Sequence, residues 1–253
     1  MDLELTGKVA LVTGASRGIG RAIAEGLAGE GVRLVIVARG VEALEEARQG
    51  LEASGAEVLA VPTDVGDDAS VTALVSKARE YFGRIDILIS NASALAVTGD
   101  RASWSASLNV DVMGAVRLVE AVLPMMRDQR GGTIVLVSST SSIEAVPMDD
   151  FGYTAAKAAL NAFAKKLAVV EGANGIRTNA LLPGSTEFPG GGWEMMREQN
   201  PALYEMVRQS VPSGRLGTPK EIADAAVWLV SPRAGWVNGA ALVVDGGQSK
   251  VIQ

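Results

Sequence analysis

The sequence of 253 residues contains no cysteine and no histidine. Without cysteine, the protein has no disulfide, no thiol nucleophile and no thiolate metal site. Without histidine, it has neither a Ser-His-Asp triad nor an imidazole metal ligand. We therefore expect no metal site, and we expect any catalytic proton transfer to use tyrosine, lysine, aspartate or glutamate.

An excess of positive charge and long apolar segments are also absent. The formal net charge is -6, whereas a nucleic-acid-binding surface is usually basic. No run of about 18 apolar residues is present that would span a bilayer. Residues 1–5 lack the basic and apolar regions of a signal peptide. These features predict a cytoplasmic protein that binds neither nucleic acid nor a membrane.

Short apolar runs alternate with helical segments along the chain, which is the pattern of an α/β protein with a buried parallel sheet. The predicted strands cover residues 8–13, 32–38, 57–61, 85–90, 133–137, 176–182 and 241–244. The predicted helices cover residues 21–30, 42–53, 67–82, 104–130, 153–171 and 219–230. Because no linker, repeat or low-complexity tract interrupts this alternation, we expect one domain, residues 1–253.

The first predicted strand runs into the glycine-rich segment TGASRGIG at residues 13–20, and a helix follows. In this context glycines let the backbone turn tightly and let a pyrophosphate approach the amides at the helix N-terminus. The spacing G-x-x-x-G-x-G is wider than G-x-G-x-x-G, so a turn that merely requires glycine is the alternative. We interpret the segment as a dinucleotide-binding loop.

The end of the second predicted strand indicates which dinucleotide is bound. An acidic residue there binds the ribose 2′-hydroxyl, whereas an arginine accommodates a 2′-phosphate. Here the strand ends in Ala38-Arg39 without a carboxylate, and Arg17 in the glycine-rich loop is placed to reach the same phosphate. Because guanidinium groups pair well with phosphate, we expect NADP(H) rather than NAD(H). The alternative is that Arg39 is a solvated turn residue.

Polar residues follow the third and fourth predicted strands. Asp64-Val65 and Asn91-Ala92 stand at the carboxyl ends of these strands, where open parallel sheets bind ligands. Asp64 is placed to hydrogen-bond an adenine amino group, although an aspartate in a loop is more often a turn former.

Tyr153 and Lys157 are four residues apart in a run of alanine, leucine and phenylalanine. On a helix the two side chains lie on the same face. A cation beside a phenol favours the ionised phenol, so the pair is suited to donate and accept a proton. The preceding strand ends in a run of hydroxyl side chains at 138–142, one of which is placed to hydrogen-bond a carbonyl substrate. For the pair alone, an ordinary tyrosine and lysine on a half-exposed helix is the alternative.

Residues 185–214 break the regular alternation. Three successive glycines at 190–192 form a flexible joint in this segment. Such a segment in a regular domain predicts a substrate lid, and a surface excursion that packs on its own core is the alternative. An apolar or ring-containing substrate is favoured by the side chains of Phe188, Trp193, Met195 and Met196.

Together, these motifs resemble a classical short-chain dehydrogenase/reductase, similar to NADP(H)-dependent 3-oxoacyl reductases, over nearly the whole chain. Further matching residues are Ile176-Arg177-Thr178-Asn179, Pro183-Gly184 and Asp245-Gly246-Gly247. The resemblance implies a Rossmann-like, doubly wound parallel sheet of about seven strands with helices on both faces. It also implies a small carbonyl or alcohol substrate, and a homotetramer or dimer that uses the helices at 104–130 and 153–171.

The resemblance implies a role for individual residues. Tyr153 acts as general acid or base at the substrate oxygen, Lys157 favours the ionised phenol and holds the nicotinamide ribose, and Ser139 orients the carbonyl. The hydride passes between nicotinamide and substrate carbon. The implied catalytic residues are Ser139, Tyr153, Lys157 and Asp111. The implied cofactor-binding residues are Gly14, Ser16, Arg17, Gly18, Ile19, Gly20, Arg39, Asp64, Val65, Asn91, Ala92, Tyr153, Lys157, Pro183, Gly184 and Thr186.

Two positions depart from the family pattern. Asn91-Ala92-Ser93 stands where the family usually has Asn-Ala-Gly. Asp111, three residues before Gly114, stands where the family has an asparagine that orients a water in a proton relay to the lysine, and Asn109 is two residues earlier. A carboxylate at 111 is able to hold that water or to pair directly with Lys157.

Two functions remain to be distinguished. The first is an oxidoreductase that transfers a hydride between NADP(H) and a carbonyl or secondary alcohol. The second is a catalytically weak or inactive NADP(H)-binding sensor or scaffold, which only Asp111 favours. A methyltransferase on a similar sheet would leave Tyr153 and Lys157 without a role.

Ser139 precedes Tyr153 by 14 residues, one more than expected, so Ser141 is a rival for the carbonyl-orienting role.

Overall fold

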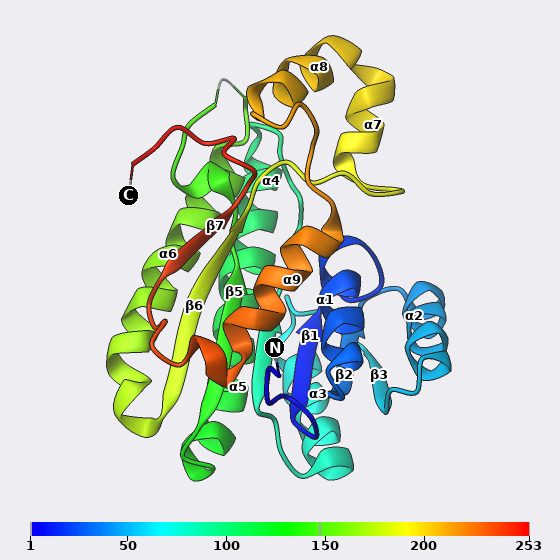
Figure 1. The fold of residues 1–253 in the computed structure, drawn as a ribbon, viewed down its shortest axis with the longest axis vertical. Coiled ribbons are helices and arrows are strands. Elements are labelled where there is room, and N and C mark those ends of the chain that lie inside the picture. Colours follow the sequence, from blue (N-terminus) through cyan, green and yellow to red (C-terminus); the bar gives the residue numbers. More distant parts are fainter. Residues whose placement is uncertain (1, 147, 253) are drawn as a thin grey trace.

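The computed structural model describes residues 2–146 and 148–252. Its centre is one sheet of seven parallel strands in the order β3-β2-β1-β4-β5-β6-β7 (Figure 1). The strands are β1 (Val9–Thr13), β2 (Arg33–Ala38), β3 (Val58–Pro62), β4 (Ile87–Ser90), β5 (Gly132–Val137), β6 (Ile176–Pro183) and β7 (Ala241–Val244). The predicted fold class, a doubly wound parallel α/β sheet of about seven strands, is confirmed.

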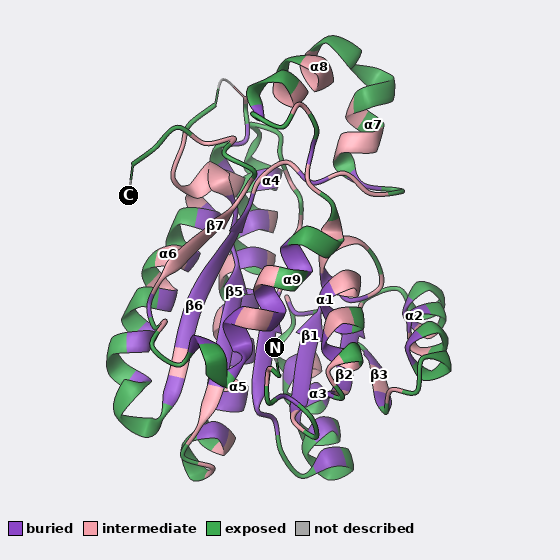
Figure 2. Ribbon diagram, viewed as in Figure 1, coloured by how far each residue is buried: buried purple, intermediate pink, exposed green. Residues whose placement is uncertain are grey.

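Helices cover both faces of the sheet. One face carries α1 (Gly18–Gly29), α2 (Val41–Ala53) and α9 (Pro219–Val230), and the other carries α3 (Asp68–Phe82), α5 (Gly114–Asp128) and α6 (Phe151–Glu171). Within β1, Val9 and Leu11 pack toward α3, α5 and α6, whereas Ala10 and Val12 pack toward α1, α2 and α9. Both sets are buried (Figure 2), which is why the strands read as continuous apolar runs.

The strand order reverses beside β1, which lies between β2 and β4. In sheets of this kind ligands bind outside the carboxyl ends of the strands at the point of reversal. The loops that follow β1, β4 and β5 meet at this edge of the sheet. The loop after β1 is the glycine-rich loop, the loop after β4 contains Asn91, and the loop after β5 contains Ser139. Among the residues that the structure describes, no helix combines the length and the apolarity that a bilayer crossing requires.

The predicted helix at 104–130 is present but not uniform. It consists of α4 (Arg101–Ala106), a π-helical segment η1 (Ser107–Met113) and α5. A π-helical turn contains more residues than an α-helical turn and is frequently found at functional sites. Asp111 lies within η1 and is buried.

Residues 185–214 contain two short helices, α7 (Gly192–Gln199) and α8 (Pro201–Ser210), which lie beyond the sheet at the top of Figure 1. Neither helix has a fully buried residue. Glu187 joins the two helices, because its carboxylate accepts hydrogen bonds from Arg197 (2.6 Å) and from the Tyr204 hydroxyl (2.8 Å). The segment predicted as a lid is thus a helical hairpin with its own internal contacts.

Candidate active site

The glycine-rich loop connects β1 to α1 and is fastened to the end of β4. Gly14 and Gly18 have φ values of +67° and +58°, in the left-handed region that favours glycine. Asn91 donates from Nδ2 to the carbonyl oxygens of Thr13 (3.0 Å) and Gly14 (3.4 Å). The Thr13 hydroxyl accepts from the backbone N–H groups of Asn91 and Ala92, each at 3.0 Å. Asn91 and Ala92 therefore hold the shape of the loop.

Replacing Gly20 with alanine should destabilise the protein. A methyl group at this position would overlap the Asn91 side-chain amide and the carbonyl of Gly14, and that carbonyl belongs to the backbone of the loop. We expect the free energy of unfolding, measured by urea denaturation, to fall by about 1–3 kcal/mol. Gly29→Ala is the matched control, because Gly29 ends the same helix and has open space at its Cβ position. Equal losses in both variants would contradict this account of the loop.

The N-terminus of α1 presents free backbone amides. Arg17 is the N-cap residue, its side chain makes no capping hydrogen bond, and the first turn of the helix contains no acidic residue. Free amides and the helix dipole together favour an anion at this end of the helix. The loop and the helix end therefore fit the pyrophosphate of a dinucleotide.

The segment before α7 packs against the glycine-rich loop. A methyl group on Gly18 would come within 2.6 Å of the Phe188 ring, so the ring lies directly against this glycine. Arg17 donates from Nη1 to the carbonyl of Gly190 (3.0 Å). These two contacts connect the α7–α8 hairpin to the predicted cofactor loop.

Three more residues predicted to bind the cofactor follow β2 and β3. Arg39 follows Ala38 directly and is exposed. Asp64 is also exposed, and its Oδ1 accepts a hydrogen bond from the backbone N–H of Gly66 (2.9 Å). This contact is the turn-forming one that the sequence offered as the alternative for Asp64. Val65 is buried and packs against Gly114 at the start of α5.

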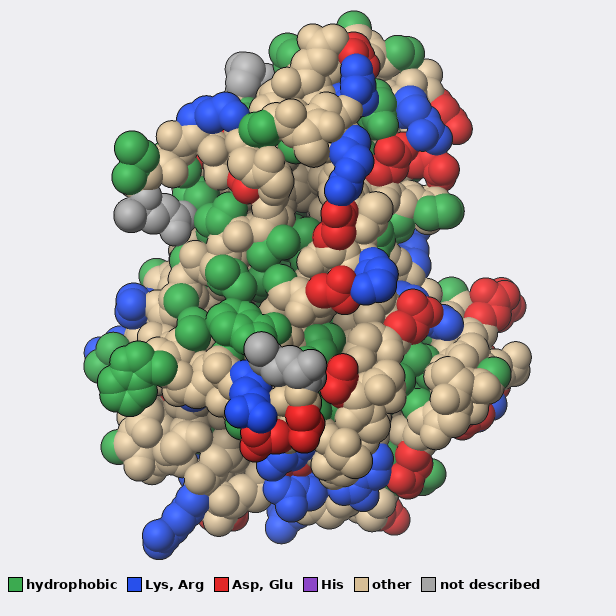
Figure 3. Space-filling model, viewed as in Figure 1, with side chains coloured by type: hydrophobic (Ala, Val, Ile, Leu, Met, Phe, Trp, Pro, Cys, Tyr) green, Lys and Arg blue, Asp and Glu red, His purple; other side chains and the backbone are tan. Residues whose placement is uncertain are grey.

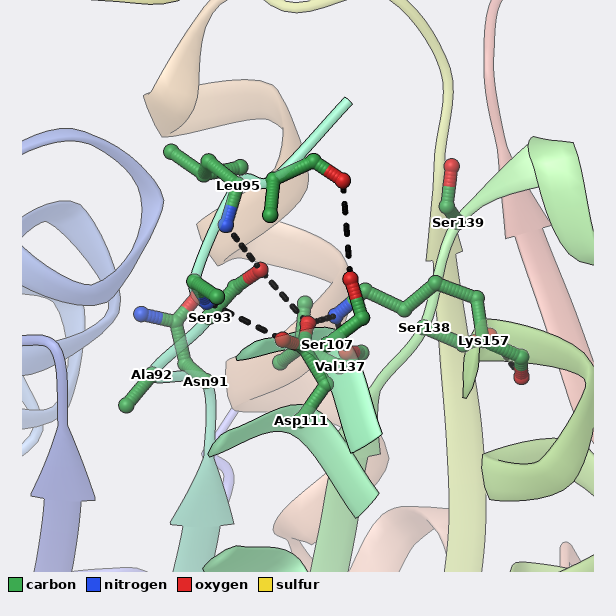
Figure 4. A network of polar contacts seen from close by, with 12 residues as sticks. Asn91, Ala92, Ser93, Leu95, Ser107, Asp111, Val137, Ser138, Ser139 and Lys157 are labelled. Atoms are coloured by element: carbon green, nitrogen blue, oxygen red, sulfur yellow. Dashed lines mark hydrogen bonds and ion pairs between the residues drawn. The ribbon is translucent and has the colours of Figure 1, made fainter. Parts of the chain in front are cut away.

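Asp111 and Lys157 form a buried ion pair (Figure 4). Nζ of Lys157 lies 3.0 Å from Oδ1 of Asp111 and 3.0 Å from the carbonyl oxygen of Val137, at the end of β5. The side chains of Lys157 and Asp111 are only 3% and 0% exposed. Because an unpaired charge is costly at such burial, the two groups depend on each other. Of the two arrangements that the sequence allowed for Asp111, the structure shows direct pairing with Lys157.

Tyr153 lies in the first turn of α6, one helical turn before Lys157, and is half-buried. Nζ of Lys157 lies 5.4 Å from the centroid of the Tyr153 ring. The other two tyrosines lie elsewhere. Tyr81 is exposed on α3, and Tyr204 donates to Glu187, which raises the pKa of the Tyr204 phenol because the carboxylate binds its neutral form. Tyr153 is therefore the tyrosine that stands beside a buried ammonium at the carboxyl edge of the sheet.

Ser139 follows β5 and caps a short 3-10 turn formed by Thr140–Ser142. Its Oγ accepts from the backbone N–H of Ser141 (3.1 Å), and its carbonyl accepts from the Ser142 hydroxyl (2.5 Å). Asn161 of α6 in turn donates to the Ser142 hydroxyl (2.8 Å). These contacts fix the turn beside α6, and Ser139 and Ser141 both belong to it.

The remaining predicted residues lie around the same edge of the sheet. Ser16 and Ile19 belong to the glycine-rich loop and the start of α1, and Pro183 ends β6. Thr186 is buried and donates from its hydroxyl to the carbonyl of Gly184 (3.0 Å). The contact between Ser93 and Asp111 was not predicted. Ser93 donates a hydrogen bond to Asp111 (2.5 Å), and the only sequence signal for it was its departure from the family pattern.

Comparison with known proteins identifies the family. A family model described as Enoyl-(Acyl carrier protein) reductase matches residues 14–249. The chain belongs to the short-chain dehydrogenase/reductase family. This membership confirms the resemblance that the motifs indicated. It also makes the chain an oxidoreductase of the short-chain type, since the similar proteins are dehydrogenases and reductases.

Two curated relatives and one solved structure illustrate the likeness of this short-chain dehydrogenase/reductase to its family. An isoepoxydon dehydrogenase of Penicillium expansum is 36% identical over 246 residues, which cover 96% of this chain and 95% of the relative. A 2-(R)-hydroxypropyl-CoM dehydrogenase of Xanthobacter autotrophicus is 36% identical over 255 residues, 96% of this chain and 99% of the relative. The structure of L-sorbose reductase from Gluconobacter frateurii, complexed with NADPH and L-sorbose, superposes with a TM-score of 0.91 at 35% identity, covering 100% of both chains.

Proposed function

We propose that the protein transfers a hydride between NADP(H) and a carbonyl or secondary alcohol substrate, with Tyr153 as general acid or base. The observation that carries this proposal is the position of Tyr153 beside the buried Lys157–Asp111 pair, at the edge of the sheet that also holds the glycine-rich loop. Because the sequence has no histidine or cysteine, Tyr153 is the proton donor best suited to this site.

The chemistry divides between the cofactor and the chain. When bound, the nicotinamide supplies or accepts the hydride. Tyr153 gives its phenolic proton to the substrate oxygen during reduction and takes a proton from the alcohol during oxidation. The Lys157 ammonium stabilises the phenolate that remains after the proton has left. Ser139 donates a hydrogen bond that orients the substrate oxygen, and Ser141, in the same turn, is the alternative donor.

The chain offers a matching cradle for the dinucleotide. The glycine-rich loop and the free N-terminus of α1 hold the pyrophosphate. Arg17 and Arg39 bind the 2′-phosphate, and Asp64 and Val65, which follow β3, contribute to the adenine side of the site. The NADPH in the L-sorbose reductase structure supports this assignment by analogy.

The purified protein should bind NADPH more tightly than NADH, and Arg39→Asp should reverse this order. The substitution removes a cation from the 2′-phosphate and supplies an acceptor for a ribose 2′-hydroxyl, so NADPH affinity should fall at least 10-fold. Thermal shifts and titration of nicotinamide fluorescence measure both affinities. Arg79→Asp is the charge-matched control, because Arg79 is exposed near the C-terminus of α3. A larger thermal shift of the unmodified protein with NADH than with NADPH would overturn the assignment to NADP(H).

The side chains near the site favour an uncharged, apolar substrate. Phe188 and Trp193 of the lid segment favour an apolar or ring-containing molecule. Residues 144–150 include three acids, Glu144, Asp149 and Asp150, which would repel an anionic substrate if they face the cleft. A panel of cyclic and linear uncharged ketones, with L-sorbose included because of the structural relative, tests the activity through loss of NADPH absorbance. Cofactor binding without turnover on the panel would favour the sensor or scaffold instead.

The quaternary structure and the location in the cell stay predictions. A homotetramer or dimer is supported by apolar surface in two places. A groove lies between α5 and α6, lined by Val116, Leu123, Pro124, Phe163 and Leu167 among others. On the other face, hydrophobic side chains gather over β7 beside α9 (Figure 3), and all four residues of β7 are half-buried. The cytoplasmic location rests on the sequence alone.

A further inference from the structure

Three hydrogen-bond donors converge on the carboxylate of Asp111 (Figure 4). The hydroxyl of Ser93 donates to Oδ1 (2.5 Å), the backbone N–H of Ala94 donates to Oδ2 (3.0 Å), and the Lys157 ammonium lies 3.0 Å from Oδ1. An ionised carboxylate only accepts hydrogen bonds, so it satisfies all three neighbours. An asparagine has one acceptor oxygen, and its NH₂ group would face one of these donors. The site is therefore built for an acid and not for the amide that the family usually has there.

The direction of the Ser93 hydroxyl is fixed by a second contact. Its oxygen accepts a hydrogen bond from the backbone N–H of Leu95 (3.1 Å), which leaves its own hydrogen for Asp111. Ser93 follows Asn91 by two residues, and Asn91 is bonded to the glycine-rich loop. A continuous set of contacts thus leads from the cofactor loop through Ser93 and Asp111 to Lys157.

We propose that Ser93 and Asp111 act as one positioning unit, which holds the Lys157 ammonium beside Tyr153. This inference rests on the proposed function for its catalytic consequence. It explains why both departures from the family pattern occur in one chain. A glycine at 93 would leave the carboxylate without its hydroxyl donor, and an asparagine at 111 would turn its NH₂ group toward one of the three donors and remove the negative charge beside Lys157.

The unit also changes the charge at the site. The groups that face Nζ of Lys157 are the Asp111 carboxylate from η1, the Val137 carbonyl from β5 and the Tyr153 ring from its own helix. Without the carboxylate, the ammonium would be buried without a counter-charge, which is costly. The Asp111 carboxylate therefore supplies the counter-charge that keeps the Lys157 ammonium in its buried position near Tyr153.

The test is a double-mutant cycle with Asp111→Asn, Ser93→Ala and the double variant. We expect kcat for ketone reduction to fall about 100-fold in Asp111→Asn and about 10-fold in Ser93→Ala, while the KM of the ketone changes less than 3-fold, since both side chains act through Lys157. The double variant should lose no more than Asp111→Asn alone, because residues that act as a unit are not additive.

Two control variants remove neighbouring polar groups. Ser107→Ala deletes a buried hydroxyl in η1 that contacts the carbonyl of Ala96 and not Asp111. Asn109→Ala deletes an exposed amide two residues before Asp111. Both should retain activity within about 2-fold. Loss of activity in Asn109→Ala, together with full activity in Asp111→Asn, would assign the family's asparagine role to Asn109 and refute the proposal.

The thermal unfolding midpoints of the same variants separate this proposal from the proposed function. If the unmodified protein reduces no ketone, the proposed function is wrong. The positioning unit still predicts that the two single variants and the double variant lower the unfolding midpoint non-additively. Additive losses in both stability and kcat would show that Ser93 and Asp111 act independently, and would overturn the inference whatever the activity of the protein.

Discussion

Replacing Tyr153 with phenylalanine should lower kcat/KM for carbonyl reduction by about 1,000-fold, because the variant keeps the ring and loses the proton that the substrate oxygen receives. Within the described residues, the Tyr153 hydroxyl makes no hydrogen bond to the chain, so its removal breaks no internal contact. We therefore expect the unfolding midpoint and the affinity for NADPH to stay near those of the unmodified protein. Steady-state kinetics with a reactive ketone measures the loss.

Tyr81→Phe is the control for Tyr153→Phe. Tyr81 lies on α3 and is 55% exposed. The substitution Tyr81→Phe removes the same hydroxyl group at a position outside the site of Lys157. It should retain full activity. If Tyr153→Phe turned over at the rate of the unmodified enzyme, Tyr153 would have no part in the proton transfer, and the proposed mechanism would be wrong while the fold and the family membership would stand.

Replacing Lys157 with methionine should abolish activity and also destabilise the protein by about 3–5 kcal/mol, which is the usual cost of removing one partner of a buried ion pair. The variant leaves the fully buried carboxylate of Asp111 without a cation. For a chain of this length the loss corresponds to a fall of roughly 10 °C in the unfolding midpoint. Urea denaturation and a thermal melt measure the change without reference to turnover.

A second substitution separates stability from catalysis in this variant. Lys157→Met/Asp111→Asn removes the unpaired charge and keeps an oxygen that accepts from Ser93 or Ala94. It should recover most of the lost stability and none of the lost activity, since the ammonium that supports Tyr153 is still missing. If Lys157→Met were as stable as the unmodified protein, the ion pair would not be formed in solution, and the account of the site would have to be revised.

Much of the architecture follows from local patterns in the sequence. Each strand was predicted within a few residues of its observed ends, because a strand buried on both faces must be apolar at every position. The glycine-rich loop was predicted from its place between a strand and a helix, and the positive φ values of Gly14 and Gly18 provide the physical reason for those glycines. These features depend on neighbours in the chain, so the sequence reveals them.

Other features depend on contacts between distant parts of the chain. The π-helical segment around Asp111 does not show in the apolar periodicity of 104–130, which reads as one ordinary helix. Helical spacing predicted that Tyr153 and Lys157 lie on one face of a helix. The sequence did not decide whether Asp111 holds a water or pairs with the lysine itself. Likewise, nothing in the sequence connected Arg17 with Gly190, because these residues are far apart in the chain.

The sequence by itself determined the class of fold, the family and the place of the glycine-rich loop, and it pointed to the candidate residues of the site, because each rests on residue types at short, regular spacings. Only the tertiary structure decided that Ser93, Asp111 and Lys157 meet in one buried network. That contact requires the loop after β4, the segment η1 and helix α6 to approach one another. Such an approach is set by packing on the sheet, and packing is a property of the whole folded chain.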